Sequence, residues 1–167
     1  IQSAFQFYNI NSYESVERLI RRGVYKGPLV CNWVAIGGGM DQPTIYSMAN
    51  FLRAIPDGTM LTVESTMLNT LPINLMGMAM GLHVRCGIED NLWARKGERI
   101  TSVKQVEQMV RIARELYRDV ATGEQARQIT GAERSVEALH GVQVFVIVHD
   151  VVRLGFTLRP SRSVVGR

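Results

Sequence analysis

The sequence lacks the features that mark several classes of protein. Its two cysteines, Cys31 and Cys86, lie in apolar runs, and neither has a second cysteine at zinc-finger spacing. The apolar run over residues 71–82 is shorter than the ~18 residues of a membrane span and is broken by Asn74 and two glycines. No Gly-x-Gly-x-x-Gly motif opens an expected helix. These absences argue against a zinc finger, a membrane protein and a dinucleotide-binding domain.

The charge of the chain gives little sign of a nucleic-acid partner. The net charge is +4, but no acidic residue follows Asp150 whereas four arginines do, so much of the basic excess lies in the tail. Before residue 132 basic and acidic residues are close to balance. Buried free thiols are typical of a reducing compartment, and we expect a cytoplasmic protein. The chain begins with Ile1 rather than Met, so a missing targeting signal excludes little.

Strand and helix patterns alternate over residues 1–131. The chain has 167 residues, of which 46% are hydrophobic, enough for one domain with a real core. Apolar and β-branched runs predict strands, and apolar residues at helical spacing predict helices. The strands are expected at residues 4–10, 29–36, 60–64 and 83–88, and the helices at 12–23, 44–54, 68–80, 102–116 and 121–131.

Four such strand-helix units imply an α/β fold with parallel strands and right-handed crossovers. The unit length of ~25–30 residues is typical of a TIM (β/α)8 barrel, which needs eight units. The pattern therefore predicts about half a barrel, with an open doubly wound sheet as the alternative. Residues 37–39 are three glycines after the second strand, a weak phosphate-loop signal for which a flexible loop is the simpler interpretation. Residues 132–167 do not continue the rhythm, and we expect a tail of uncertain structure that is appended, misread or irregular.

The fourth expected strand ends in charged residues. Side chains alternate between the two faces of a strand, so His83, Arg85 and Gly87 share one face. The other face carries Val84, Cys86 and Ile88, which suit packing against helices. Glu89 and Asp90 follow at the C-terminal end of the strand, where barrel enzymes keep their catalytic groups.

These residue types suit a catalytic site. A carboxylate can ligate a divalent metal ion, and a second carboxylate can act as a general base or hold Arg85 in place. The arginine can bind a substrate carboxylate or stabilise a developing oxyanion. A structural ion-pair cluster is the alternative, because such clusters also occur at strand ends. For His83, a satisfied interior histidine is the simpler interpretation.

The stretch from Gly81 to Leu92 (GLHVRCGIEDNL) resembles the signature of the β-keto acid cleavage enzymes, typified by 3-keto-5-aminohexanoate cleavage enzyme. Flanking segments agree, among them residues 28–39, the Leu71-Pro72-Ile73-Asn74 helix start and residues 110–122. The resemblance covers residues 1–131, which by this likeness form the C-terminal half of a TIM barrel, about its last four β/α units. Residues 132–167 do not match the family.

The resemblance also implies a reaction. Members of this family convert a β-keto acid and acetyl-CoA into acetoacetate and a new CoA thioester, with one zinc ion held by an H-x-H pair and a glutamate. By position that glutamate is Glu89, while Arg85 and Asp90 act together on the substrate. The expected partners are these small molecules and further copies of the chain, with neither nucleic acid nor membrane.

The sequence departs from the family at two places. It contains no H-x-H, so the other zinc ligands are expected in a missing N-terminal half. Ser3-Ala4 stands where the family has a Pro-Glu pair, with Gln6 two residues further on. Two alternatives therefore stay open. One is a catalytically incomplete barrel that self-associates through its open edges. The other is a different metal-dependent TIM-barrel enzyme, such as an aldolase that uses magnesium.

Overall fold

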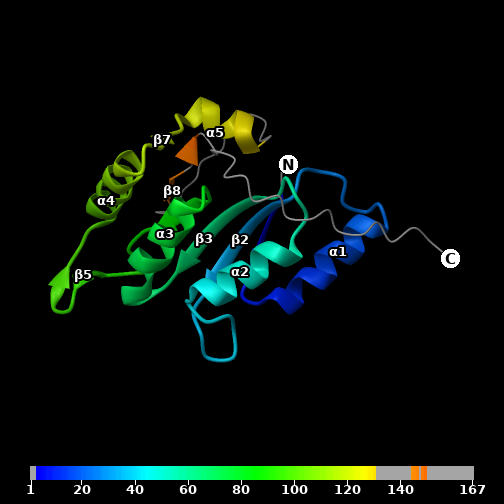
Figure 1. The fold of residues 1–167 in the computed structure, drawn as a ribbon, viewed down its shortest axis with the longest axis horizontal. Coiled ribbons are helices and arrows are strands. Elements are labelled where there is room, and N and C mark those ends of the chain that lie inside the picture. Colours follow the sequence, from blue (N-terminus) through cyan, green and yellow to red (C-terminus); the bar gives the residue numbers. More distant parts are fainter. Residues whose placement is uncertain (1–2, 131–143, 147, 150–167) are drawn as a thin grey trace.

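The computed structural model of the chain describes residues 3–130, 144–146 and 148–149 (Figure 1). Its strands are β1 (Ala4–Phe7), β2 (Val30–Ala35), β3 (Met60–Ser65), β4 (His83–Cys86), β5 (Trp93–Arg95), β6 (Glu98–Arg99), β7 (Asp119–Val120), β8 (Val144–Val146) and β9 (Val148–His149). Its α-helices are α1 (Tyr13–Arg21), α2 (Ile45–Ala54), α3 (Thr70–Ala79), α4 (Ser102–Glu115) and α5 (Gly123–Thr130). Every strand and helix predicted from the sequence pattern is present, with ends shifted by a few residues.

The main sheet is built in chain order. Strands β1, β2, β3 and β4 lie side by side and parallel, and β8 pairs antiparallel with the outer edge of β4. Sequential parallel neighbours are the arrangement of the TIM-barrel family, whereas a doubly wound sheet reverses its strand order at a switch point. Five of the described strands form the main sheet, and β5 with β6 and β7 with β9 form two separate two-stranded sheets. This α/β architecture is consistent with part of a barrel.

One hydrophobic core joins the sheet to its helices. Figure 1 shows α1, α2 and α3 on the same side of β2 and β3. The buried strand residues in this core include Phe7, Cys31, Trp33, Leu61, Val63, Val84 and Cys86, and the helices contribute Val16, Met48, Phe51, Ile73, Met78 and Met109. All of these strand residues lie on one face of the pleat. The four helices α1–α4 share a single face, so the described residues do not show the doubly wound arrangement, which places helices on both faces.

The opposite face of the sheet carries a row of polar side chains. The parallel register places Gln6 beside Asn32, Asn32 beside Thr62 and Thr62 beside His83, so the four form one row across the strands. Two residues further along, Glu64 and Arg85 follow on the same face, because side chains alternate along each strand. Asn32, Thr62, Glu64, His83 and Arg85 are all buried.

The end of β4 differs from the sequence-based expectation. The strand stops at Cys86, because Gly87 begins a turn in which the N–H groups of Asp90 and Asn91 both donate to the Gly87 carbonyl, at 3.2 and 3.1 Å. Ile88 therefore leaves the helix-packed face and is 42% exposed, so that part of the prediction is wrong. The expected positions of Val84 and Cys86 in the helix-packed core are confirmed.

Two other local expectations are revised. Thr101 rather than Ser102 caps α4, since the Thr101 hydroxyl accepts from the N–H of Lys104 at 3.3 Å. Residues 37–39 all have positive φ in a turn where the Gly37 N–H donates to the Asp41 carbonyl, and α2 begins only at Ile45. The glycines thus form a loop and not a helix-opening phosphate cradle. The hairpin of β5 and β6 was not predicted.

Among the described residues, no helix combines the length and the apolar character needed to cross a membrane.

Helix α3 packs unusually close to the sheet at Gly77. A Cβ built on Gly77 would lie 2.3 Å from Val63 Cγ2 and 3.6 Å from Val84 Cγ1. Val63 is fully buried, and a β-branched side chain has little rotamer freedom with which to move aside. The helix backbone can approach β3 and β4 this closely only because residue 77 has no side chain. The helix in turn holds β4 through Asn74, whose Nδ2 donates to the Arg85 carbonyl at 2.7 Å.

We therefore expect Gly77→Ala to destabilise the fold by roughly 1–3 kcal/mol, because the added methyl group overpacks the core at Val63. This loss outweighs the better helix propensity of alanine. Urea unfolding of the full-length protein measures this loss. Val63→Ala combined with Gly77→Ala removes the clashing methyl group and should cost less than the sum of the two single changes. If the two losses of unfolding free energy simply add, contact with Val63 is not the reason that Gly77→Ala destabilises the fold.

Candidate active site at the carboxyl end of strand β4

The three site residues predicted from the sequence lie together in the structure. Arg85 belongs to β4, and the turn that starts at Gly87 folds Glu89 and Asp90 back toward it. The Asp90 carbonyl accepts from the Met67 N–H at 2.8 Å, which ties this turn to the end of β3. The placement of the three residues at the C-terminal end of a parallel strand agrees with the sequence-based expectation.

Arg85 is buried among carboxylates. Its side chain is 5% exposed, and its Nη1 donates to Glu64 Oε2 at 2.7 Å. Its Nη2 donates to Glu89 Oε2 at 2.8 Å and lies 3.5 Å from Asp90 Oδ2. Glu64 and Asp90 are nearly as buried as the arginine, at 3% and 8% side-chain exposure, whereas Glu89 is 58% exposed at the rim. Removing one partner from a buried ion pair is costly, so these charges depend on one another.

Glu64 is a site residue that the sequence analysis missed. It was assigned only to the third strand, in a run whose other members are apolar or small. Its Oε2 accepts from Asn32 Nδ2 at 2.6 Å as well as from Arg85. The available signal was a single carboxylate on the same face as Thr62 in a strand otherwise fit for burial. A buried charge needs a partner, so Glu64 pointed to a cation on a neighbouring strand.

Burial and like charges shape the protonation of the carboxyls. Burial is the main cause that raises the pKa of Glu64 to about 7, and the negative charge of Asp90 adds to the rise. The hydrogen bond from Asn32 and the Arg85 guanidinium act in the opposite direction. Burial also raises the pKa of Asp90, whereas the Arg85 charge and a side-chain hydrogen bond with Glu64 lower it and the Glu89 charge adds to the rise. With three carboxyls around one guanidinium, the site holds a proton more readily than isolated carboxyls do.

Unpaired polar atoms concentrate at this place. Four buried side-chain atoms on the polar face and its strand-end turn make no hydrogen bond, namely Asn32 Oδ1, His83 Nδ1, Arg85 Nε and Asp90 Oδ2. Among the described residues the fifth such atom is Asn74 Oδ1, on the helix side. Unsatisfied buried polar groups are rare in folded proteins, and their grouping favours a functional surface over a purely structural ion-pair cluster.

His83 and the cysteines are interior residues, as expected. Burial lowers the pKa of His83, which favours the neutral imidazole. The expectation that His83 is satisfied is wrong in one respect, since its Nδ1 has no partner. Cys31 and Cys86 are buried free thiols, and burial raises their pKa to about 12 and about 11.

The described residues do not form a zinc site by themselves. No three His, Cys, Asp or Glu side chains in that part of the chain come together as a metal-binding group. The carboxylates of Glu64, Glu89 and Asp90 surround a guanidinium instead. Structural and catalytic zinc sites use three or four protein ligands, so Glu89 could supply only one of them.

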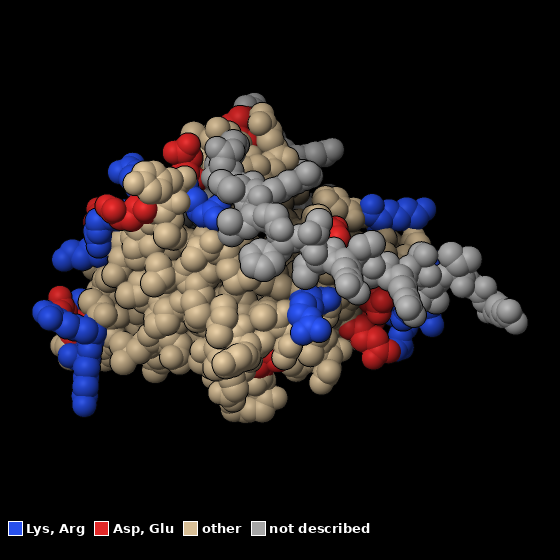
Figure 2. Space-filling model, in the orientation of Figure 1, with Lys and Arg blue, Asp and Glu red and all other residues tan. Residues whose placement is uncertain are grey.

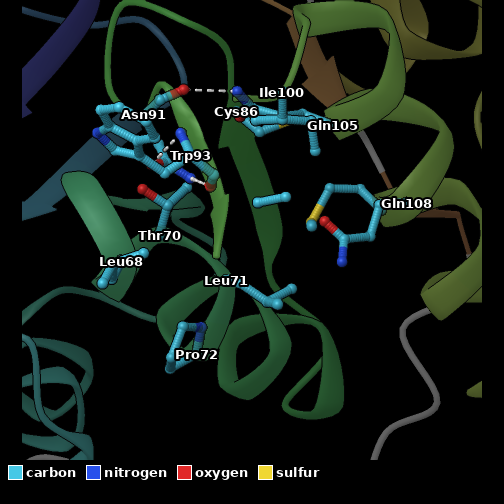
Figure 3. A pocket seen from close by; sticks show the side chains of 12 residues that line it. Leu68, Thr70, Leu71, Pro72, Cys86, Asn91, Trp93, Ile100, Gln105 and Gln108 are labelled. Atoms are coloured by element: carbon cyan, nitrogen blue, oxygen red, sulfur yellow. Dashed lines mark hydrogen bonds between the residues drawn. The ribbon is translucent and has the colours of Figure 1, made fainter. Parts of the chain in front are cut away.

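A cavity of about 150 Å³ lies on the other side of β4. Figure 3 shows side chains of α3, α4 and the segment from Asn91 to Trp93 around it, with Gln105 Nε2 donating to the Asn91 carbonyl at 2.6 Å. No charged residue lines it, and Cys86 is its only contribution from β4. The cavity is therefore separate from the Arg85 cluster and contains none of the titratable carboxyls.

The fold is a parallel α/β domain with a buried cluster of one arginine and three carboxylates at the strand ends. The family model for the beta-keto acid cleavage enzymes matches residues 1–131. This chain belongs to the beta-keto acid cleavage enzyme family, as its sequence motif predicted.

Individual relatives agree with the family match. The chain is 34% identical over 119 residues to the 3-keto-5-aminohexanoate cleavage enzyme of Acetoanaerobium sticklandii, an alignment that covers 70% of this chain and 43% of the relative. It is 38% identical over 83 residues to the enzyme of that name from Fusobacterium nucleatum, covering 49% and 30%. It is 26% identical over 130 residues to the 3,5-dioxohexanoate:acetyl-CoA acetone transferase of Paraburkholderia graminis, covering 75% and 42%. The chain thus spans less than half the length of these relatives.

The raised pKa of Glu64 predicts a pH-dependent stability. The folded protein binds the Glu64 proton more tightly than the unfolded chain, so this stabilisation is complete below about pH 4.5 and is lost as pH rises through about 7. Relative to Glu64→Gln, which has no proton to lose, the wild type should therefore lose about 1–3 kcal/mol of unfolding free energy between pH 5 and pH 8.

Urea unfolding of the full-length protein at both pH values measures this difference. Glu98→Gln, an exposed change in the β5–β6 hairpin, serves as the control and should track the wild type. If the wild type and Glu64→Gln change in parallel with pH, Glu64 is ionised in the folded state at all of these pH values and the assignment fails.

Proposed function

We propose that the full-length protein cleaves a β-keto acid by exchange with acetyl-CoA, giving acetoacetate and a new CoA thioester. In this exchange the bond between the keto carbon and C2 of the β-keto acid breaks. The CH2–carboxylate part joins the acetyl group, and the acyl part goes to CoA. Family membership supports this reaction type, and one relative is named as an acetyl-CoA acetone transferase. The observation that carries the proposal is the buried Arg85 with its carboxylates at the carboxyl end of β4.

Arg85 is the anion-binding group in this proposal. A guanidinium with planar donors recognises a carboxylate or a developing oxyanion, and its strength increases when water is excluded. Arg85 is 4% exposed, and its Nε has no hydrogen-bond partner. A β-keto acid brings both a carboxylate and a keto oxygen that becomes negative during C–C bond cleavage. Arg85 is suited to hold either of them.

Asp90 is the proton acceptor in this proposal. The hydrogens at C2 of a β-keto acid are acidic because two carbonyl groups flank that carbon, and a carboxylate with a raised pKa is a stronger base than an ordinary one. Burial raises the pKa of Asp90, although Arg85 and a side-chain hydrogen bond with Glu64 oppose the rise, and its Oδ2 is buried beside the guanidinium. Arg85 Nη2, 3.5 Å from that oxygen, orients the carboxylate and keeps it available in its ionised form.

The proposal extends to a closed TIM barrel and to a zinc ion with Glu89 as one ligand. Bound zinc would polarise the keto group as a Lewis acid. Glu89 is half-exposed at the strand end, which suits a ligand at the mouth of a barrel. The remaining ligands and strands would come from outside the described residues, which hold no group of three metal-binding side chains. A magnesium-dependent aldolase is the competing metal chemistry, since magnesium prefers oxygen ligands and water.

Self-association is also part of the proposal. Helix α3 contains no charged residue, and it exposes Leu75 together with neighbouring Leu68. Figure 2 shows that the face viewed there is largely free of charged side chains over α2 and α3. Exposed apolar surface of this kind favours contact between copies of the chain. Sedimentation velocity of the full-length protein measures the association directly.

Replacement of the central arginine tests the proposed function. We expect Arg85→Lys to lower kcat/KM for CoA-thioester formation by roughly 100-fold or more, because lysine keeps the charge but loses the planar set of donors. The assay uses the full-length protein, acetyl-CoA and a panel of β-keto acids. Arg95→Lys, at an arginine that is 84% exposed in the hairpin, is the matched control and should leave turnover unchanged. If Arg85→Lys has wild-type turnover, Arg85 takes no part in the reaction and the proposed site is wrong.

Zinc ligation by Glu89 is tested separately. Glu89→Gln in the full-length protein should lower the zinc content well below one per chain, because a neutral amide is a poor ligand for Zn²⁺. Elemental analysis after dialysis measures zinc and magnesium together, with Glu98→Gln as the control. An unchanged zinc content would exclude Glu89 as a ligand, and magnesium in place of zinc would favour the aldolase alternative.

A further inference from the structure

Glu64 has no assigned part in the reaction described so far, although it makes the most buried contact with Arg85. Its side chain is 3% exposed, compared with 8% for Asp90 and 58% for Glu89. It also comes from a different strand, β3, whereas Glu89 and Asp90 both follow β4 in the chain. A residue in this position can hold Arg85 in one orientation without meeting the substrate.

We propose that Glu64, backed by Asn32, is a positioning residue that fixes which edge of the Arg85 guanidinium faces the reacting groups. This inference rests on the proposed function, because the edge matters only if Arg85 acts on substrate. Glu64 Oε2 accepts from Arg85 Nη1 at 2.7 Å and from Asn32 Nδ2 at 2.6 Å. The three residues thus link strands β2, β3 and β4 through one carboxylate oxygen.

The contact with Glu64 orients the Arg85 guanidinium. With Nη1 held by Glu64, the Nη2 end of the guanidinium points to the strand-end turn, where Glu89 and Asp90 lie. Glu64 lies on β3, which pairs with β2 on one side and β4 on the other, whereas Glu89 lies in the turn after β4 and its side chain is 58% exposed. Charge and position at Nη1 therefore decide where Nη2 and Nε are presented. A misplacement of about 1 Å in such a group costs on the order of 100-fold in rate.

The hydrogen bond from Asn32 supports a positioning role for Glu64 over a chance ion pair with Arg85. An amide that donates to a carboxylate oxygen already bound by arginine restricts the rotation of that carboxylate. Asn32 also donates to Gln6 Oε1 at 3.4 Å, which continues the connection to β1. All four parallel strands thus contribute one polar side chain to the chain of contacts that ends at Arg85.

A double-mutant cycle on the full-length protein tests the proposal. Glu64→Gln keeps the shape and an acceptor oxygen but removes the charge, and we expect kcat to fall roughly 10-fold with KM changed less than about 3-fold. In the Arg85→Lys background the same change should cost less than about 3-fold, because the guanidinium that Glu64 positions is gone. Glu98→Gln is the exposed control and should be neutral in both backgrounds.

The outcomes separate the inference from the proposed function. Equal losses from Glu64→Gln in both backgrounds would indicate a general structural role and overturn the inference. Full activity of Glu64→Gln, with Arg85→Lys impaired, would also overturn it while leaving the proposed function intact. No effect of either change on turnover would overturn both. If circular dichroism shows that Glu64→Gln does not fold, Glu64→Asp replaces it in the same double-mutant cycle. Its shorter carboxylate should lower kcat to a similar extent and leave KM nearly unchanged.

Discussion

A buried guanidinium is tolerated in a protein only when anionic partners replace the water it loses. Arg85 meets that condition through Glu64 and Glu89 at 2.7 and 2.8 Å, with Asp90 at 3.5 Å. Three carboxyls share this one cation, and burial penalises the charged forms of Glu64 and Asp90. This penalty raises the pKa of Glu64 to about 7 and the pKa of Asp90 in the same direction. The same burial that requires anionic partners for Arg85 thus raises the pKa of Glu64 and Asp90.

The two faces of the sheet differ in the residues that they carry. Helices α1–α4 cover one face with a continuous apolar core, and Gly77 lets α3 approach β3 at van der Waals distance. The other face carries the polar row that begins at Gln6 and ends at His83, with the Arg85 cluster one step nearer the strand ends. Because the strands are parallel, their carboxyl ends meet at one edge. The register of the parallel strands therefore brings polar residues that are far apart in the chain side by side near that edge.

Sequence reasoning reached the residues that lie close together in the chain. Arg85, Glu89 and Asp90 fall within six positions, and the alternation of a strand places them at one end. Glu64 and Asn32 were missed because their part depends on pairing between β2, β3 and β4, which pattern alone does not specify. The order of the strands was open for the same reason, and only the structure showed that helices α1–α4 share one face. Ile88 was misplaced because Gly87 begins a turn one residue before the expected strand end, so that β4 stops at Cys86.

We propose that the Arg85 site transfers the CH2–carboxylate part of a β-keto acid to an acetyl group. The most direct measurement gives the full-length protein a β-keto acid and acetyl-CoA carrying a 13C-labelled acetyl group, and follows the label by NMR. The account predicts labelled acetoacetate in which the acetyl carbons form its keto and methyl positions, together with an unlabelled acyl-CoA in equal amount. Labelled free acetate with no labelled acetoacetate would contradict it, because acetyl-CoA would then be hydrolysed and not used as the acceptor.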